Sequence, residues 1–260
     1  MMVTNGIDLS REGTIATLTL NRPTRKNAIT FAMWQALADI FTDFGRDPTL
    51  RGVILTGAGS TFSAGADIGD FEQTRASTEQ GIAYEVAVDA ACDAIAALGR
   101  PVVAAIQGHC YGGACNLAMA CDFRIISANA RMAIPAAKLS IVYGVKGTAR
   151  LLGLVGLAEA KRIFFSAQPF NADHALRIGF AQGIVEDPLA GAKTLLDDFS
   201  DLAPLSIAGA KAILNGLATT DKPFDADAAE THILQALNSA DYKEGRAAFS
   251  QKRAPRFQGR

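Results

Sequence analysis

Residues 101–125 read PVVAAIQGHCYGGACNLAMACDFRI, a continuous apolar run that leads through two adjacent glycines into a helical pattern. A short apolar run of this kind is typical of a strand buried on both faces. Gly112 and Gly113 predict a turn, and residues 114–120 predict a helix of small apolar side chains. A strand followed by a turn and a helix is the repeating unit of a parallel α/β sheet.

Strands and helices alternate over residues 14–140. A β-rich segment at 14–20 ends before Pro23, and the glycine-bounded RGVILTG at 51–57 predicts another buried strand. Thr30 is a candidate N-cap for a helix whose apolar side chains recur at helical spacing. This alternation predicts βαβ units, right-handed crossovers and a mostly parallel sheet.

The remaining segments are predicted to be mostly helical. A long helical pattern spans about 78–98, residues 122–135 supply one or two more strands, and helices dominate from about residue 148. We therefore predict an α/β fold with a helical C-terminal region that packs on the sheet or on a neighbouring subunit.

Composition narrows the class of protein. The 260 residues are 49% hydrophobic with a net charge of −1, and a basic stretch occurs only in the tail KRAPRFQGR, which disfavours nucleic-acid binding. No apolar run approaches the ~18 residues of a membrane span, and no export signal is visible. The four cysteines lack CxxC spacing, so we expect free thiols, no metal site and a cytoplasmic protein.

Two loops between a strand and a helix could carry chemistry. Small residues occupy TFSAGADIGDF at 61–71 and GHCYGGACNLA at 108–118, where helices are expected to begin. Small side chains let a ligand approach the backbone, and free N–H groups at a helix start attract anions. Two such loops could form an oxyanion hole, although glycines also occur in ordinary connections. Neither loop matches GxGxxG or a P-loop.

Six segments, in this order, resemble the crotonase (enoyl-CoA hydratase/isomerase) superfamily over nearly the whole chain. They are NRPTRKNAIT (21–30), VILTGAGSTFSAGADI (53–68), residues 101–125, GTARLLGLVG (147–156), AQPFNADHALRIGFAQGIV (167–185) and EGRAAFSQKRAPRF (244–257). The resemblance implies a spiral of ββα units over residues 1–195 and a helical oligomerisation region over 196–260. It also implies a homotrimer or a dimer of trimers.

The resemblance further implies an acyl-CoA thioester substrate and no permanently bound cofactor. By motif position, the backbone N–H groups of Ala66 and Gly113 would hold the thioester oxygen, where negative charge grows as an enolate forms. Coenzyme A would lie near Arg25, Lys26, Ala28, Ala64, Asp67 and Ile68, with Phe249 and Lys252 contacting it, often from a neighbouring subunit. A simpler interpretation is that Arg25 and Lys26 are solvated surface charges, that Asp67 caps a helix, and that Phe249 only packs against other side chains.

The chain departs from the hydratase pattern at two positions. Hydratases of the family use two glutamates, one three residues after the second oxyanion glycine and one directly after a proline. Here these positions hold Asn116 and, after Pro135, Ala136. Neither side chain can accept and return a proton at neutral pH, so hydration is disfavoured. An isomerase that needs the second carboxylate is disfavoured for the same reason.

Tyr143 is the remaining candidate for chemistry. Its segment LSIVYGVKG resembles a stretch of methylmalonyl-CoA decarboxylase, a family member that has tyrosine there, lacks the hydratase glutamate, and has histidine in place of Ala66. Tyr143 could orient a leaving carboxylate or supply a proton, or it could only pack. Glu85 and Lys138 are more simply surface charges, and His109 a structural histidine.

Two functions remain open at this point. The leading one is a lyase or isomerase of acyl-CoA and fatty acid metabolism that stabilises an enolate with decarboxylase-like or isomerase-like chemistry. The alternative is a paralogue that binds acyl-CoA without catalysis, because the same two substitutions, Asn116 and Ala136, also fit a lost activity.

Overall fold

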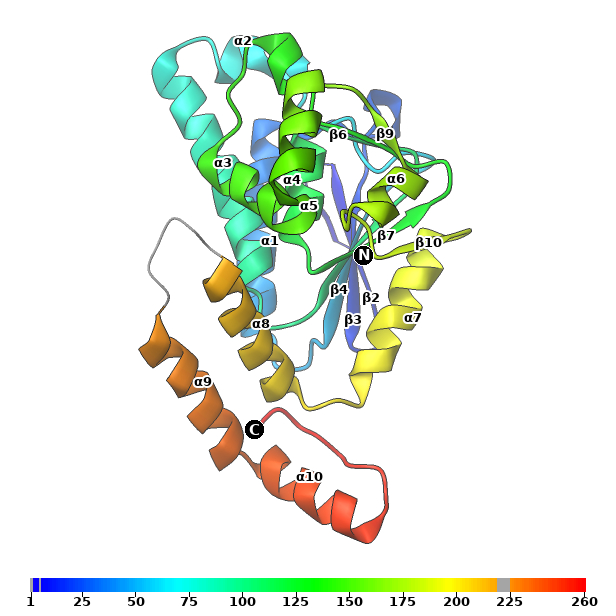
Figure 1. Cartoon of the computed structure of the whole chain (residues 1–260), viewed down its shortest axis with the longest axis vertical. Helices are drawn as coiled ribbons and strands as arrows, with labels where there is room; N and C mark the ends of the chain where they lie inside the picture. The colour runs from blue at the N-terminus through cyan, green and yellow to red at the C-terminus, as the bar shows by residue number, and fades with distance from the viewer. Residues whose placement is uncertain (1, 5, 219–224) are drawn as a thin grey trace.

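The computed structural model of the chain describes residues 2–4, 6–218 and 225–260. A seven-stranded sheet runs through its centre in the order β1-β2-β3-β4-β5-β7-β10 (Figure 1). In this sheet β1, β2 and β3 pair antiparallel. Every pairing from β3 to β10 is parallel, and this parallel part is what the alternating pattern predicts. The strands are β1 (Met2–Thr4), β2 (Ile7–Glu12), β3 (Ile15–Leu20), β4 (Gly52–Gly57), β5 (Val102–Ile106), β7 (Phe123–Ser127) and β10 (Gly183–Val185).

Both faces of the parallel sheet are covered, which explains the continuous apolar runs. Successive side chains of a strand point to opposite faces. Val53 and Leu55 of β4 therefore join the main core, whereas Ile54 joins a smaller cluster with Ala192 and Leu196 of α7 (Pro188–Ser200). The main core lies beneath α1 (Phe31–Arg46), α3 (Thr78–Ala97), α4 (Gly113–Ala120) and α5 (Val145–Ser166).

Helix starts follow the local sequence. The Thr30 side chain accepts a hydrogen bond from the Met33 N–H, so its predicted role as the N-cap of α1 is confirmed. Ser77 and Gln80 form a capping box at the start of α3. The short helical segments are η1 (Pro23–Arg25), η2 (Ile68–Asp70), α2 (Phe71–Thr74), η3 (Ala136–Leu139) and α6 (Ala172–Arg177).

A small second sheet positions the two candidate loops. It contains β6 (His109–Tyr111), β8 (Arg131–Ala133) and β9 (Phe170–Asn171), in the order β6-β8-β9. An isolated bridge joins Ser63 to Cys110, and another joins Ile29 to Ala66. The first bridge holds the loop after β4 against the loop after β5, and the second holds the loop after β4 against the segment that precedes α1.

The last three helices form an arm. α8 (Pro204–Ala218) is anchored by Lys211, whose ammonium donates to the Ile95 and Arg100 carbonyls and lies 2.8 Å from Asp122. α9 (Ala226–Asn238) and α10 (Ala240–Gln251) continue to the lower end of the molecule, far from α4 (Figure 1). The expected boundary between residues 195 and 196 falls inside α7, which packs on the sheet. The division into a core and an oligomerisation region stays a prediction.

The four cysteines are buried and free. Burial raises the pKa of Cys92 and of Cys121 to about 12, and it raises that of Cys110 well above its ordinary value. None of the described helices combines the length and the apolar character that a membrane crossing requires.

Candidate active site

Gly65 and Gly113 bring the two candidate loops into contact. A Cβ on Gly65 would lie 2.4 Å from the Tyr111 carbonyl oxygen and 3.2 Å from the Gly113 nitrogen, and Gly65 has a φ of +93°. A Cβ on Gly113 would lie 3.6 Å from the Ala66 nitrogen. At position 65 only glycine tolerates this conformation and this approach to the Tyr111 carbonyl, so the loops can share one site.

Two backbone N–H groups are left without partners at this contact. The bridge to Ile29 uses the Gly65 carbonyl and the Asp67 N–H, at 2.8 and 2.9 Å, so the N–H of Ala66 faces the other way. Gly113 is the first residue of α4, where no preceding turn can accept its N–H. Within the described part of the chain neither group donates a hydrogen bond. Together they can stabilise an oxyanion.

Tyr143 supports the turn before Gly113. Gly112 adopts φ +53° and donates its N–H to the Ala133 carbonyl at 2.8 Å. The Tyr143 hydroxyl donates to the Gly112 carbonyl oxygen at 3.1 Å. Burial raises the pKa of Tyr143 well above its ordinary value, so the phenol keeps its proton at neutral pH. The structure places Tyr143 at the site, and its catalytic role stays a prediction.

Asn116 is buried one turn into α4, and its Oδ1 accepts a hydrogen bond from Arg150 Nη1 at 3.1 Å. Arg150 Nη2 lies 2.7 Å from Asp93 of α3, which also binds Lys146 at 2.5 Å. Ala136 is buried at the start of η3. The family resemblance marked Asn116 and Ala136, but nothing in the sequence indicated the ion pairs of Asp93.

Asp67 is one of the six positions near residues 25–68 that are predicted to contact coenzyme A. This nearly buried carboxylate accepts hydrogen bonds from Arg22 at 2.8 Å, Arg25 at 3.1 Å and the Gly69 N–H at 3.1 Å. Burial alone would raise the pKa of Asp67, but these hydrogen bonds outweigh burial and lower it. Asp67 is the N-cap of η2, so the interpretation of Asp67 as a helix cap is confirmed.

The other five positions lie in the same two segments, 25–28 and 64–68, which a backbone hydrogen bond joins. Ala28 donates its N–H to the Arg25 carbonyl, and Ala64 donates to the Lys26 carbonyl at 2.9 Å. Ile68 follows Asp67 and is exposed. The two segments therefore lie together next to Ala66, with four of the six positions exposed and Ala28 and Asp67 buried.

Phe249 and Lys252 do not join this cluster within one chain. Phe249 is 88% exposed on α10, and Lys252 caps the same helix in a left-handed conformation. α10 lies at the lower end of the molecule, far from α4 (Figure 1). The suggestion that Phe249 simply packs is wrong for the isolated chain, because its ring is solvent-exposed.

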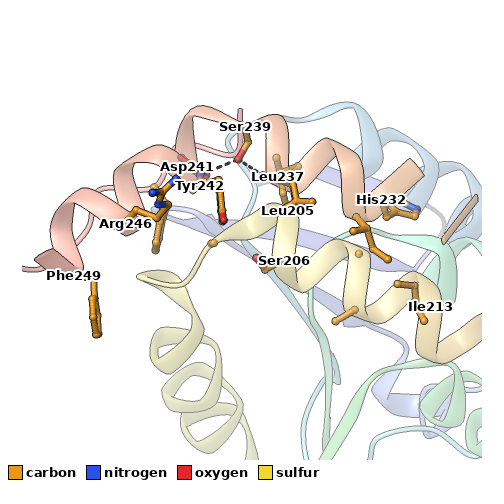
Figure 2. Close-up of a pocket in the computed structure, with 17 residues that line it drawn as sticks. Leu205, Ser206, Ile213, His232, Leu237, Ser239, Asp241, Tyr242, Arg246 and Phe249 are labelled. Carbon is orange, nitrogen blue, oxygen red and sulfur yellow. Dashed lines mark hydrogen bonds between the residues drawn. The ribbon is translucent and has the colours of Figure 1, made fainter. Parts of the chain in front are cut away.

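An apolar cavity of about 590 Å³ lies within the arm, between α8, α9 and α10. Figure 2 shows Leu205 and Ile213 of α8 facing His232 and Leu237 of α9. Phe249 is the one predicted site residue that lines it. Sequence reasoning did not locate this cavity, because its walls come from three helices whose packing the helical spacing alone does not specify.

Arg124 fixes the far end of α4 and was also missed. Its buried guanidinium donates to the Ala118 carbonyl at 3.2 Å, the Cys121 carbonyl at 2.8 Å and the Phe180 carbonyl at 2.5 Å, and to Gln182 at 2.9 Å. Burial lowers the pKa of Arg124 to about 10. A cation at a helix C-terminus also complements the helix dipole. A charged residue inside an otherwise apolar strand was the available signal.

The remaining polar candidates have structural partners or face solvent. Glu85 forms an ion pair with Arg75, which stacks over Tyr84 at 4.7 Å. His109 packs edge-on against Tyr111 with ring centroids 5.0 Å apart. Lys138 is exposed at the surface of η3.

Comparison with known proteins agrees with this geometry. A family model described as enoyl-CoA hydratase/isomerase matches residues 10–260. Short-chain-enoyl-CoA hydratase from Clostridium acetobutylicum is 34% identical over 259 residues, covering 97% of each chain. Carnitinyl-CoA dehydratase from Salmonella typhi is 33% identical over 267 residues, covering 99% of this chain and all 100% of that protein.

Solved structures confirm the predicted crotonase-like α/β fold, including a helical C-terminal region. The crystal structure of an enoyl-CoA hydratase/carnithine racemase from Magnetospirillum magneticum has a TM-score of 0.92 at 35% identity, covering 99% of this chain and 97% of the other. A putative family protein from Hyphomonas neptunium also gives a TM-score of 0.92, at 32% identity and 98% coverage of both chains. The chain therefore belongs to the enoyl-CoA hydratase/isomerase family.

Proposed function

We propose that this acyl-CoA enzyme stabilises a thioester enolate without the paired carboxylates of a hydratase. The two unpartnered N–H groups of Ala66 and Gly113, facing one site, carry the proposal. The thioester oxygen would accept a hydrogen bond from each N–H group, and the N–H dipoles would stabilise the negative charge that develops on that oxygen. The Asp67 cluster beside Ala66 would receive coenzyme A.

Decarboxylase-like chemistry fits the missing carboxylates best. When the C2–carboxylate bond breaks, carbon dioxide leaves and the electron pair remains as the enolate, so this step needs no base. A proton donor then delivers a proton to C2. Tyr143 is the candidate donor because it lies beside the Gly112 turn and carries a proton at neutral pH; to donate, its O–H would have to turn from the Gly112 carbonyl towards C2. Isomerase-like chemistry shares the same enolate and would need a base other than Asn116 or Ala136.

Standard hydration is disfavoured by the same two positions. Delivering water across a double bond requires groups that accept and return protons, which an amide held by Arg150 and a methyl group cannot do. Two relatives are named a hydratase and a dehydratase, but a relative's name does not assign the reaction of this chain.

A panel of enoyl-, malonyl- and methylmalonyl-type CoA esters, followed by mass spectrometry and chromatography, tests the proposal. We expect a product that has lost carbon dioxide or an isomer of unchanged mass. A product that has gained one water would contradict it.

The alternative is a protein that binds acyl-CoA but does not react with it, again because of Asn116 and Ala136. Measurable binding of several CoA esters with no product from any of them would support this alternative over the enzyme.

We also infer that the arm binds further copies of this chain, as a homotrimer or a dimer of trimers. The arm exposes Leu214, Ile233, Leu237 and Phe249. In isolation these side chains form an apolar surface of the kind that marks an interface. Phe249 and Lys252 could then reach coenzyme A in a neighbouring subunit.

Sedimentation equilibrium of the full chain should give three or six times the 27.3 kDa monomer mass. Ile233→Glu in the arm should shift the protein towards smaller species. Leu189→Glu, at a comparably exposed leucine of α7, serves as the control. A monomer at micromolar concentration is the result that contradicts the inference.

A further inference from the structure

The amide of Asn116 has a defined orientation. Arginine carries only hydrogen-bond donors, so Arg150 must face the amide oxygen, and Nη1 lies 3.1 Å from Oδ1. Arg150 is itself fixed by Asp93 at 2.7 Å, and its side chain is only 16% exposed. The amide cannot turn over without placing its NH₂ group against the guanidinium.

This orientation leaves the Nδ2 donor facing away from Arg150. Among the described residues, Asn116 Nδ2 donates no hydrogen bond. In the described part of the chain, Asp8 Oδ1 is the only side-chain polar atom that is fully buried and has no hydrogen-bond partner. Nδ2 therefore keeps some accessible area, although Asn116 as a whole is only 5% exposed.

Helix geometry places this accessible donor on the side of α4 that carries the free N–H of Gly113. Asn116 follows Gly113 by three residues on α4, so the two lie on the same side of the helix, separated by about 4.5 Å along its axis. Helical side chains tilt towards the N-terminus, which brings the amide back over the turn that begins at Gly113. A thioester oxygen held at Gly113 would thus place the first acyl carbons beside Nδ2.

We propose that Asn116 donates a hydrogen bond from Nδ2 to an oxygen on C3 of the acyl group. This inference rests on the proposed function, because it requires the thioester oxygen at Ala66 and Gly113. The substrate class is then a CoA ester with a C3 oxygen acceptor, either a ketone or a carboxylate. A saturated C3 would leave the donor unpaired, so the site discriminates against simple acyl chains.

Isothermal titration calorimetry with two probes tests this assignment. Acetoacetyl-CoA and butyryl-CoA have acyl chains of equal length and differ by the C3 oxygen. We expect the wild-type protein to bind acetoacetyl-CoA about tenfold more tightly, as one hydrogen bond in a shielded site allows. Asn116→Asp keeps an acceptor for Arg150 but replaces the donor with a carboxylate, so it should abolish or reverse this preference.

Two further variants complete the experiment. Asn238→Asp makes the same charge change on the exposed end of α9 and should leave the preference intact. Asn116→Leu removes the donor without adding charge and should bring the two affinities together; it substitutes for Asn116→Asp if that variant does not fold. Equal wild-type affinities for the two probes, or a preference that survives both Asn116 variants, would overturn the assignment. Failure to bind either probe would instead overturn the proposed function.

Discussion

Gly113→Pro is expected to lower kcat about 100- to 1000-fold on the substrate that the CoA-ester panel identifies, because it removes one of two oxyanion donors. Proline is tolerated at the first position of a helix, so α4 itself should persist. Steady-state kinetics, with far-ultraviolet circular dichroism as a check on folding, measures the effect.

Gly113→Ala is the matched control. It keeps the N–H but adds a Cβ that would lie 3.1 Å from Trp34 Cζ2, and Trp34 is held by its hydrogen bond to Tyr84 at 3.0 Å. The alanine variant therefore measures the effect of crowding, and the additional loss in the proline variant measures the donor. Equal activity in the two variants would show that the Gly113 N–H does not stabilise the reacting oxygen.

Arg124→Met is expected to lower the free energy of unfolding by about 3–5 kcal/mol, because it strands several buried acceptors at once. The Ala118 and Cys121 carbonyls at the end of α4 and the Phe180 carbonyl all lose the same guanidinium. Urea denaturation followed by tryptophan fluorescence can measure this, since the chain has one tryptophan, Trp34, in the core.

Arg124→Lys separates charge from geometry. An ammonium retains the favourable interaction with the helix C-terminus but cannot span the same set of acceptors, so an intermediate loss of stability is expected. One ordinary hydrogen bond contributes about 1 kcal/mol. If the free energy of unfolding of Arg124→Met differs from that of the wild type by less than about this amount, the guanidinium network does not hold α4 in place.

Local features of the chain could be predicted because their causes lie close together in the sequence. The Thr30 cap, the buried strand β4 and the glycine turn before α4 each depend on a few adjacent residues. The antiparallel strands β1 and β2 were missed; the sequence reasoning assigned no strand before residue 14.

The candidate site was predictable as two loops but not as a geometry. That Gly65 and Gly113 meet depends on bridges such as Ser63 to Cys110, which join segments far apart in the sequence. The hydrogen bond between Arg150 and Asn116 spans 34 positions, and no local pattern encodes it. Family resemblance selected the positions, whereas tertiary packing determined their partners.

The two N–H groups proposed to stabilise the oxyanion belong to the main chain, and this has an evolutionary consequence. Ala66 and Gly113 contribute N–H groups whose direction is set by a backbone bridge and by a helix start. Side chains around them can therefore diversify by mutation without dismantling the anion-stabilising device. Under the proposed function, Asn116 and Ala136 are exchanges of this kind: one backbone arrangement can host different reaction chemistries, each set by a few neighbouring side chains.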